Sequence, residues 1–228
     1  MKAHLEAILT PDEYEIPRAT DEFAQWWITK HNMFGATREG VIYCREGKGM
    51  TKKLYEEAQP MLSFMRAYYS RSQTRCKLLA GTEADDAVLL NGVGNVEKRI
   101  QITFAGDGYA DHLRRAELTK KGHVDALTKP SVQGKGRLKI VGFPEGAAVR
   151  HDTIVHEVVQ NIEAAAQNKH SRGYSSGYSL VIGFNDSILN RDDWPDLVGL
   201  HNRISGWFTE LFLIGIHGIV VVPQPKSA

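Results

Sequence analysis

The sequence predicts an α/β fold in which helices flank a mixed central sheet, and three observations lead to this expectation. Helical and strand-like hydrophobic patterns alternate along residues 51–228. Three short runs of β-prone residues follow one another between residues 76 and 105, as in an antiparallel meander. A later run, "YSLVIGF" at residues 178–184, is almost entirely apolar, which is typical of a strand covered on both faces.

Residues 1–50 are expected to form an N-terminal decorating arm, followed by a single domain over residues 51–228. The arm lacks a clean hydrophobic period, and prolines and the glycine-rich "REGKGM" interrupt it. Its one strongly apolar patch, "FAQWWITK", contains Trp26 and Trp27. These two side chains mark either an interface or, more commonly, anchors in the core.

The first element of the domain is predicted to be a helix over residues 51–69. Its apolar face follows helical spacing and consists of Leu54, Ala58, Met61, Leu62, Met65 and Tyr69. Thr51 is suited to cap the N-terminus. Pro60 should kink the helix or split it in two, because proline lacks the backbone N–H group.

Strands and helices then alternate along the rest of the domain. Three strands are expected at residues 76–81, 86–91 and 99–105, and "NGVGN" between the last two is typical of a hairpin turn. Gly122 is a suitable C-cap for a helix that begins at residue 107. A basic strand is expected at residues 132–143, a helix at 151–170 and the central strand at 178–184. Another helix is expected within residues 185–208, and two strands follow at 210–216 and 218–223.

The third strand carries an unusual polar pair. In "RIQIT", Ile100 and Ile102 point to one side of the sheet, so Gln101 and Thr103 must point to the other. Two uncharged polar side chains on one face of a strong strand indicate that this face is either wetted by solvent or lines a site.

Three motifs extend this observation to neighbouring elements. "EADDAVLL" places Asp86 at the start of the second strand, "RIQIT" supplies the polar pair, and "NIEAAAQNKHSRGYSSGYSLVIGF" joins a lysine-bearing helix to a buried strand. In this order the chain resembles the PD-(D/E)XK nuclease superfamily, as a divergent member. The resemblance covers roughly residues 51–215. It implies a restriction-endonuclease-like core, α-βββ-α-β, with an inserted helix and basic strand.

The resemblance also implies a function, namely metal-dependent hydrolysis of nucleic-acid phosphodiesters with Mg²⁺ or Mn²⁺ as the cofactor. Asp86 would be the principal metal ligand, and Gln101 takes the position of the family's second acid. The chain departs from the family at Gln101, which carries no charge, and at Thr103, which stands where the family has a lysine. Glu57 could restore the missing carboxylate as a metal ligand. Lys169 could take the catalytic role of the missing strand lysine, and it would stabilise developing negative charge.

The distribution of charge fits a nucleic-acid partner. The formal net charge of the chain is only +1, but residues 114–139 hold eight basic residues against two acidic ones. Phosphate contacts come from such lysines and arginines. The residues expected to bind nucleic acid, with DNA favoured, are Arg114, Arg115, Lys120, Lys121 and Lys135. Homo-oligomerisation is left open.

Structural roles compete with each of these functional ones. Asp86 could satisfy backbone donors at the start of a strand, and Gln101 with Thr103 could lie on a solvated face. Lys169 could interact with the helix dipole, and Glu57 could be a surface acid. A non-enzymatic domain that binds nucleic acid or a protein partner therefore remains the alternative to a nuclease.

The cysteine count and the hydropathy predict a cytoplasmic protein without a membrane partner. Cys44 and Cys76 do not form a disulfide framework, so a reducing compartment is expected. The N-terminus has acidic residues where a signal peptide would be apolar. No apolar run approaches the roughly 20 residues that a membrane-spanning helix needs. The spacing of the histidines and cysteines predicts no structural zinc site.

Overall fold

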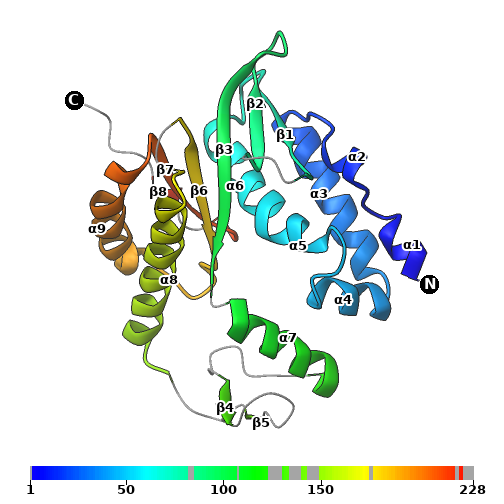
Figure 1. Ribbon diagram of the computed structural model, residues 1–228, viewed down its shortest axis with the longest axis vertical. Helices are drawn as coiled ribbons and strands as arrows, with labels where there is room; N and C mark the ends of the chain where they lie inside the picture. Colours follow the sequence, from blue (N-terminus) through cyan, green and yellow to red (C-terminus); the bar gives the residue numbers. More distant parts are fainter. Residues whose placement is uncertain are drawn as a thin grey trace.

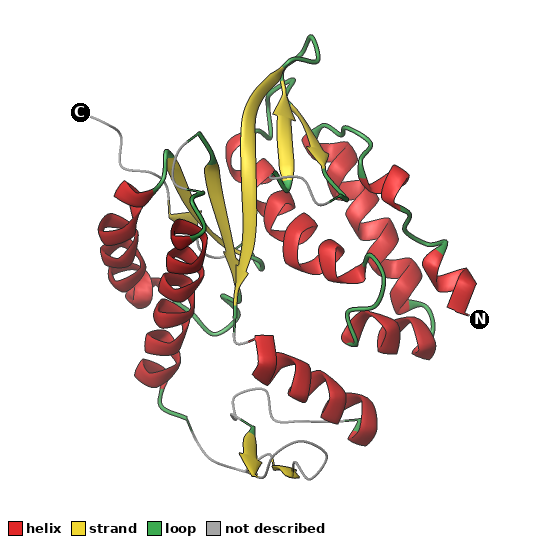
Figure 2. Cartoon of the chain, viewed as in Figure 1, coloured by secondary structure: helices red, strands yellow, loops and turns green. Residues whose placement is uncertain are grey.

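The computed structural model describes residues 2–81, 85–106, 108–122, 130–133, 140–142, 149–174, 177–218 and 221–222. Within them, a mixed six-stranded sheet has helices on both of its faces (Figure 1, Figure 2). The predicted α/β class, with a mixed central sheet flanked by helices, is therefore confirmed.

The sheet combines an antiparallel meander with a parallel half. Its strand order is β1-β2-β3-β6-β7-β8. The pairs β1/β2, β2/β3 and β7/β8 are antiparallel, whereas β3/β6 and β6/β7 are parallel. The strands are β1 (Arg75–Leu78), β2 (Ala87–Leu90), β3 (Val96–Ala105), β6 (Ser179–Phe184), β7 (Glu210–Gly215) and β8 (Val221–Val222). The expected hairpin turn between β2 and β3 is present, with Gly94 at a φ of 87°.

Residues 2–49, predicted as a decorating arm, form helices whose buried side chains belong to the core of the sheet. Phe23, Trp26 and Phe34 lie in one hydrophobic cluster with residues of the first three strands and of the helix that follows the arm. Trp26 is thus a core anchor rather than an exposed interface residue. The four helices are α1 (Lys2–Glu6), α2 (Pro11–Tyr14), α3 (Thr20–Gly35) and α4 (Arg38–Arg45).

The helix predicted over residues 51–69 is present, but it contains a π-helical turn. It consists of α5 (Thr51–Lys53), the π turn η1 (Leu54–Ala58) and α6 (Gln59–Tyr68). The π turn ends at Ala58, two residues before Pro60, whose missing N–H group prevents a regular hydrogen-bonding pattern there. The prediction of Thr51 as N-cap was wrong. Its hydroxyl donates to the carbonyl of Lys48 at 2.6 Å, and the cap position belongs to Met50.

The parallel pairing of β3 with β6 requires a long crossover, and the crossover contains an insertion. It runs through α7 (Gly108–Lys121), a separate two-stranded antiparallel sheet, and α8 (His151–Ser171). Gly122 ends α7 with a φ of 81°, as predicted. Where one basic strand was expected, there are two short ones, β4 (Ser131–Gln133) and β5 (Ile140–Gly142). The described chain ends with η3 (Arg191–Asp193), α9 (Trp194–Ile204), η4 (Ser205–Trp207), β7 and β8.

The two faces of the sheet have separate hydrophobic clusters, and this decides where the polar pair of β3 points. Ile100 and Ile102 belong to the cluster under α3 and α6, whereas Ala105 belongs to the cluster under α8 and α9. Because side chains alternate along a strand, Gln101 and Thr103 face α8. In the part of the chain that the structure describes, no helix has the length and apolar character needed to cross a membrane.

Candidate functional site

Asp86, Gln101 and Lys169 meet at one point between β3 and the end of α8. The ammonium group of Lys169 donates to Oε1 of Gln101 at 2.7 Å and lies 3.5 Å from Oδ2 of Asp86. Gln101 is only 2% exposed, so the alternative of a solvated face is wrong for this residue. The structure therefore brings together three of the four residues predicted to be catalytic.

Through its carboxylate, Asp86 contacts both the backbone of β3 and the ammonium group of Lys169. Its N–H donates to the carbonyl of Ile100 at 3.0 Å, one residue before β2 begins. Its Oδ2 accepts from the N–H of Ile102 at 2.7 Å. The carboxylate thus satisfies a backbone donor where the two strands separate, which is the expected structural role. The same carboxylate oxygen lies 3.5 Å from Nζ of Lys169, so the structural role leaves Asp86 at the contact with Lys169.

Lys169 reaches this point from the last turn of α8, where the helix dipole favours a positive charge. Its side chain is 17% exposed and the side chain of Asp86 is 21% exposed. A largely buried ammonium group needs partners for its three N–H donors. Asp86 and Gln101 provide two, and the ring of Tyr174 lies 5.1 Å from the nitrogen.

Glu57 approaches Asp86 from the π turn but binds other partners. Its Oε2 accepts from Nζ of Lys53 at 3.1 Å and from the hydroxyl of Tyr14 at 3.2 Å. Burial raises the pKa of the Glu57 carboxyl, Lys53 opposes this effect, and the charge of Asp86 raises the pKa further. Glu57 is therefore not a simple surface acid. It forms a second polar group that is electrostatically coupled to the first.

Lys53 and Tyr14 are residues of this second group that the sequence analysis missed. Lys53 precedes Glu57 by four residues, a spacing at which helical side chains meet, so the pair was detectable from sequence. Lys53 also donates to the carbonyl of Leu79 at 3.2 Å and so ties the helix to the end of β1. Tyr14 comes from α2 and offered no comparable signal. Burial and the charge of Glu57 hold its pKa well above the ordinary value.

The oxygen donors at this site suit a hard divalent cation. Asp86 and Glu57 offer carboxylates and Gln101 offers an amide oxygen, and Mg²⁺ is commonly held by one or two carboxylates together with water. Burial is the main cause of the raised pKa of Glu57, the charge of Asp86 adds to it, and a bound cation would relieve this added repulsion. Across the described ranges, no three or more His, Cys, Asp or Glu side chains cluster in a way that could hold a metal.

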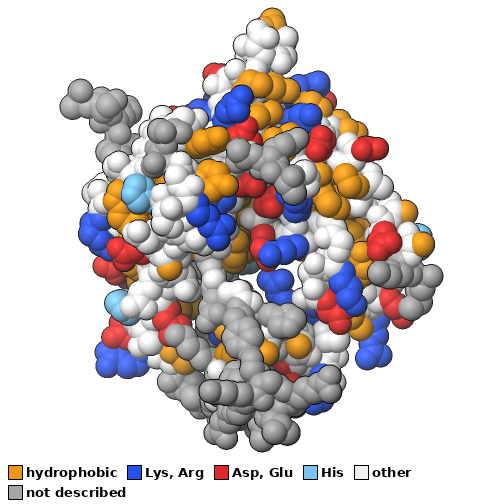
Figure 3. All heavy atoms as spheres, in the orientation of Figure 1, with side chains coloured by type: hydrophobic (Ala, Val, Ile, Leu, Met, Phe, Trp, Pro, Cys, Tyr) orange, Lys and Arg blue, Asp and Glu red, His pale blue; other side chains and the backbone are white. Residues whose placement is uncertain are grey.

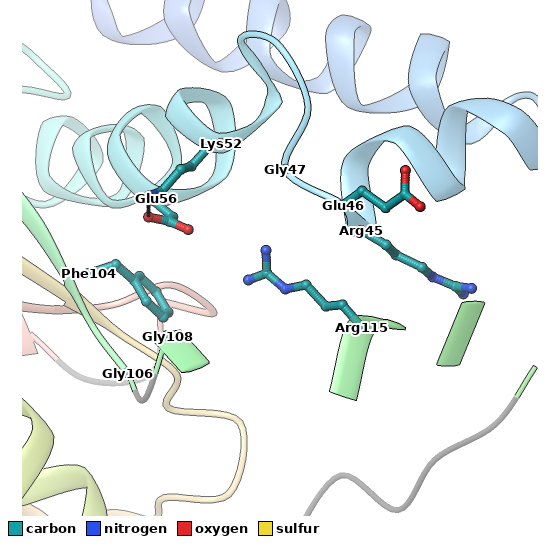
Figure 4. Close-up of a pocket in the computed structure, with 9 residues that line it drawn as sticks. All are labelled: Arg45, Glu46, Gly47, Lys52, Glu56, Phe104, Gly106, Gly108 and Arg115. Atoms are coloured by element: carbon teal, nitrogen blue, oxygen red, sulfur yellow. Dashed lines mark ion pairs between the residues drawn. The ribbon is translucent and has the colours of Figure 1, made fainter. Parts of the chain in front are cut away.

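Two cavities lie at the C-terminal end of β3, and none of Asp86, Gln101, Lys169 and Glu57 is among the described residues that line them. The first, of about 270 Å³, is lined by residues that include Lys52, Glu56, Phe104 and Arg115 (Figure 4). The second, of about 420 Å³, shares Phe104 and Arg115 and also includes Arg114. Figure 3 shows basic and acidic side chains together beside a hollow near the centre of the view.

The residues predicted to bind nucleic acid divide between these cavities and the far end of α7. Arg114 and Arg115 line the cavities next to β3. Lys120 and Lys121 lie at the other end of the helix and line a separate cavity of about 210 Å³ beside α4. Lys121 also pairs with Glu117 at 2.6 Å. Lys135 lies outside the described residues.

Comparison of the chain with protein-family models, with curated proteins and with solved structures finds no match.

Proposed function

We propose that this chain is a metal-dependent phosphodiester hydrolase that acts on nucleic acid, with Mg²⁺ or Mn²⁺ held by Asp86, Glu57 and Gln101. The observation that carries the proposal is the contact of one ammonium group, that of Lys169, with both Asp86 and Gln101. Side chains from a strand start, a strand and a helix 68 residues further along the chain converge there. The resemblance to PD-(D/E)XK nucleases requires such a convergence, which supports a restriction-endonuclease-like core.

The residues of the site would have distinct roles. A bound divalent cation would supply Lewis-acid polarisation of the phosphoryl oxygen and a more acidic water. Asp86 is held in place for ligation by the N–H of Ile102. Lys169 would stabilise the negative charge that develops on the phosphoryl group, since its ammonium lies beside the ligand set and is largely shielded from water. Arg114 and Arg115 would bind neighbouring phosphates.

The test is cleavage of end-labelled single-stranded DNA, duplex DNA and RNA in Mg²⁺, Mn²⁺ or EDTA. We expect cleavage only with a divalent cation. Asp86→Asn should abolish it, and Lys169→Met should slow it by about 10²–10³-fold, the effect typical of losing one charge-stabilising donor. Asp152→Asn is the matched control, because Asp152 is exposed at the opposite end of α8. Unchanged cleavage in both site variants would refute the proposal.

One observation favours a second candidate, a domain that binds nucleic acid without cutting it. Lys169 already supplies a positive partner to Asp86 and Gln101, so these groups are satisfied without a metal ion. Such a domain would show no cleavage in Mg²⁺ or Mn²⁺. Its affinity for nucleic acid would survive Asp86→Asn and would fall when Arg114, Arg115 and Lys120 are replaced by glutamine.

A further inference from the structure

Phe104 lies where the two cavities at the C-terminal end of β3 meet. It lines both of them, and its ring is half-buried. Gly183 on β6 is the direct neighbour of Phe104 in the sheet, and a Cβ atom there would lie 3.4 Å from Cδ2 of the ring. The ring therefore rests on the sheet beside a residue without a side chain, and it borders open space on two sides.

The first cavity joins this aromatic ring to positive charge. Figure 4 shows Arg115 reaching from α7 towards Phe104 and Glu56. Arg115 makes no ion pair with another residue of the described ranges. Lys52 lies on the other side of this cavity, and its Nζ is 3.8 Å from Oε2 of Glu56. An arginine without a carboxylate partner, facing a cavity, is available to an anion.

The second cavity adds hydrogen-bonding groups to a wall that also holds Arg114, Arg115 and Glu157. Its wall includes the side-chain amides of Gln160, Asn161 and Asn185. Amides of this kind both donate and accept, so they can pair with the edge of a nucleobase. An aromatic face, a guanidinium group and amides around one space match the three parts of a nucleotide, which are base face, phosphate and base edge.

We propose that the ligand of this region is single-stranded nucleic acid, with one unpaired base stacked on Phe104 and its phosphate bound by Arg115. This inference rests on the proposed function and names its substrate class. Cavities of about 270 and 420 Å³ hold one or two nucleotide-sized groups. In a duplex, base pairing and stacking keep the base face and edge from entering such spaces, whereas a single strand can present both.

Phe104 lies further along β3 than the proposed active site. It follows Gln101 by three residues, which corresponds to about 10 Å at a rise of roughly 3.3 Å per residue, and its side chain lies on the opposite face of the sheet because side chains alternate along a strand. The subsite at Phe104 is therefore separate from the contact of Lys169 with Asp86 and Gln101.

The test measures binding without cleavage, in EDTA, by fluorescence anisotropy of labelled 20-nucleotide dT, 20-nucleotide rU and a 20-base-pair DNA duplex. We expect wild-type protein to bind at least one single strand about tenfold more tightly than the duplex. Phe104→Leu should weaken that binding by about 5- to 150-fold, the range for loss of one base–aromatic stack. Phe104→Trp should retain it. Tyr68→Leu, at a half-exposed aromatic residue away from the cavities, is the control. Circular dichroism verifies that each variant is folded.

Each outcome of this experiment has one meaning. Duplex binding equal to or tighter than single-strand binding, no binding to any of the three, or equal affinity in Phe104→Leu and wild type overturns the inference. Single-strand binding that depends on Phe104 supports it even if no divalent cation produces cleavage, in which case only the hydrolase proposal fails. The dT and rU arms show whether the subsite prefers a DNA or an RNA strand.

Discussion

Replacing Lys169 with methionine should destabilise the protein by an amount that its two contacts predict. Methionine keeps most of the length of the side chain but removes the ammonium group. Oε1 of Gln101 then loses the donor at 2.7 Å inside a residue that is 2% exposed. A buried acceptor left without a partner costs about 1–3 kcal/mol. Asp86 also loses an ion pair whose members are about one-fifth exposed, which adds about 1 kcal/mol after solvent screening.

The expected loss is therefore about 2–4 kcal/mol in the free energy of unfolding, most of it from the amide of Gln101. A double-mutant cycle isolates this part. Gln101→Leu removes the orphaned oxygen, so in the Lys169→Met background it should recover about 1–2 kcal/mol. In the wild-type background the same change should be destabilising, because it leaves the ammonium of Lys169 with one partner fewer.

The assay is urea denaturation at pH 7, followed by circular dichroism and by tryptophan fluorescence so that coincident transitions verify two-state unfolding. Lys121→Met is the matched control. Lys121 is 52% exposed and pairs with Glu117, so its loss should change stability by less than about 0.5 kcal/mol. Additive effects of Lys169→Met and Gln101→Leu, within about 0.5 kcal/mol, would show that the two side chains are not coupled as argued.

Two further predictions concern the frame of the site. Gly183→Ala places a Cβ atom 2.4 Å from Cγ and 2.7 Å from Cβ of Pro60, so it should destabilise the protein by about 1–3 kcal/mol. Pro60→Gly removes both of these atoms, so in thermal melting Gly183→Ala should cost less in the Pro60→Gly background than in the wild type. An equal cost in both backgrounds would remove this contact as the cause. Burial raises the pKa of Glu210, but hydrogen bonds from Lys98 and Ser179 outweigh it and leave the pKa lowered. This stabilisation is present above the ordinary pKa of a glutamate and disappears as pH falls through the lowered value, so acid titrations of stability should lose that component in Glu210→Gln. An identical pH profile in the variant would contradict it.

The order and type of most elements were determined by local sequence patterns. The period-two alternation of "RIQIT" placed Gln101 and Thr103 on one face of a strand, and the apolar run at residues 178–184 identified the central strand β6. The position of Pro60 predicted an irregular helix over residues 51–69. Gly122 predicted the C-terminal end of α7. These features depend on the chirality and hydrogen bonding of a few adjacent residues, so they are readable without the rest of the chain.

Only the tertiary structure decided which of these polar residues meet. Gln101 is buried because α8 covers its face of the sheet, and Lys169 reaches it across a separation of 68 residues. Tyr14 contacts Glu57 because residues 2–49 complete the hydrophobic core, although they show no clear period in the sequence. Contacts between distant segments depend on how whole helices pack against the sheet, and packing is a property of the summed shape and burial of many side chains rather than of any short motif.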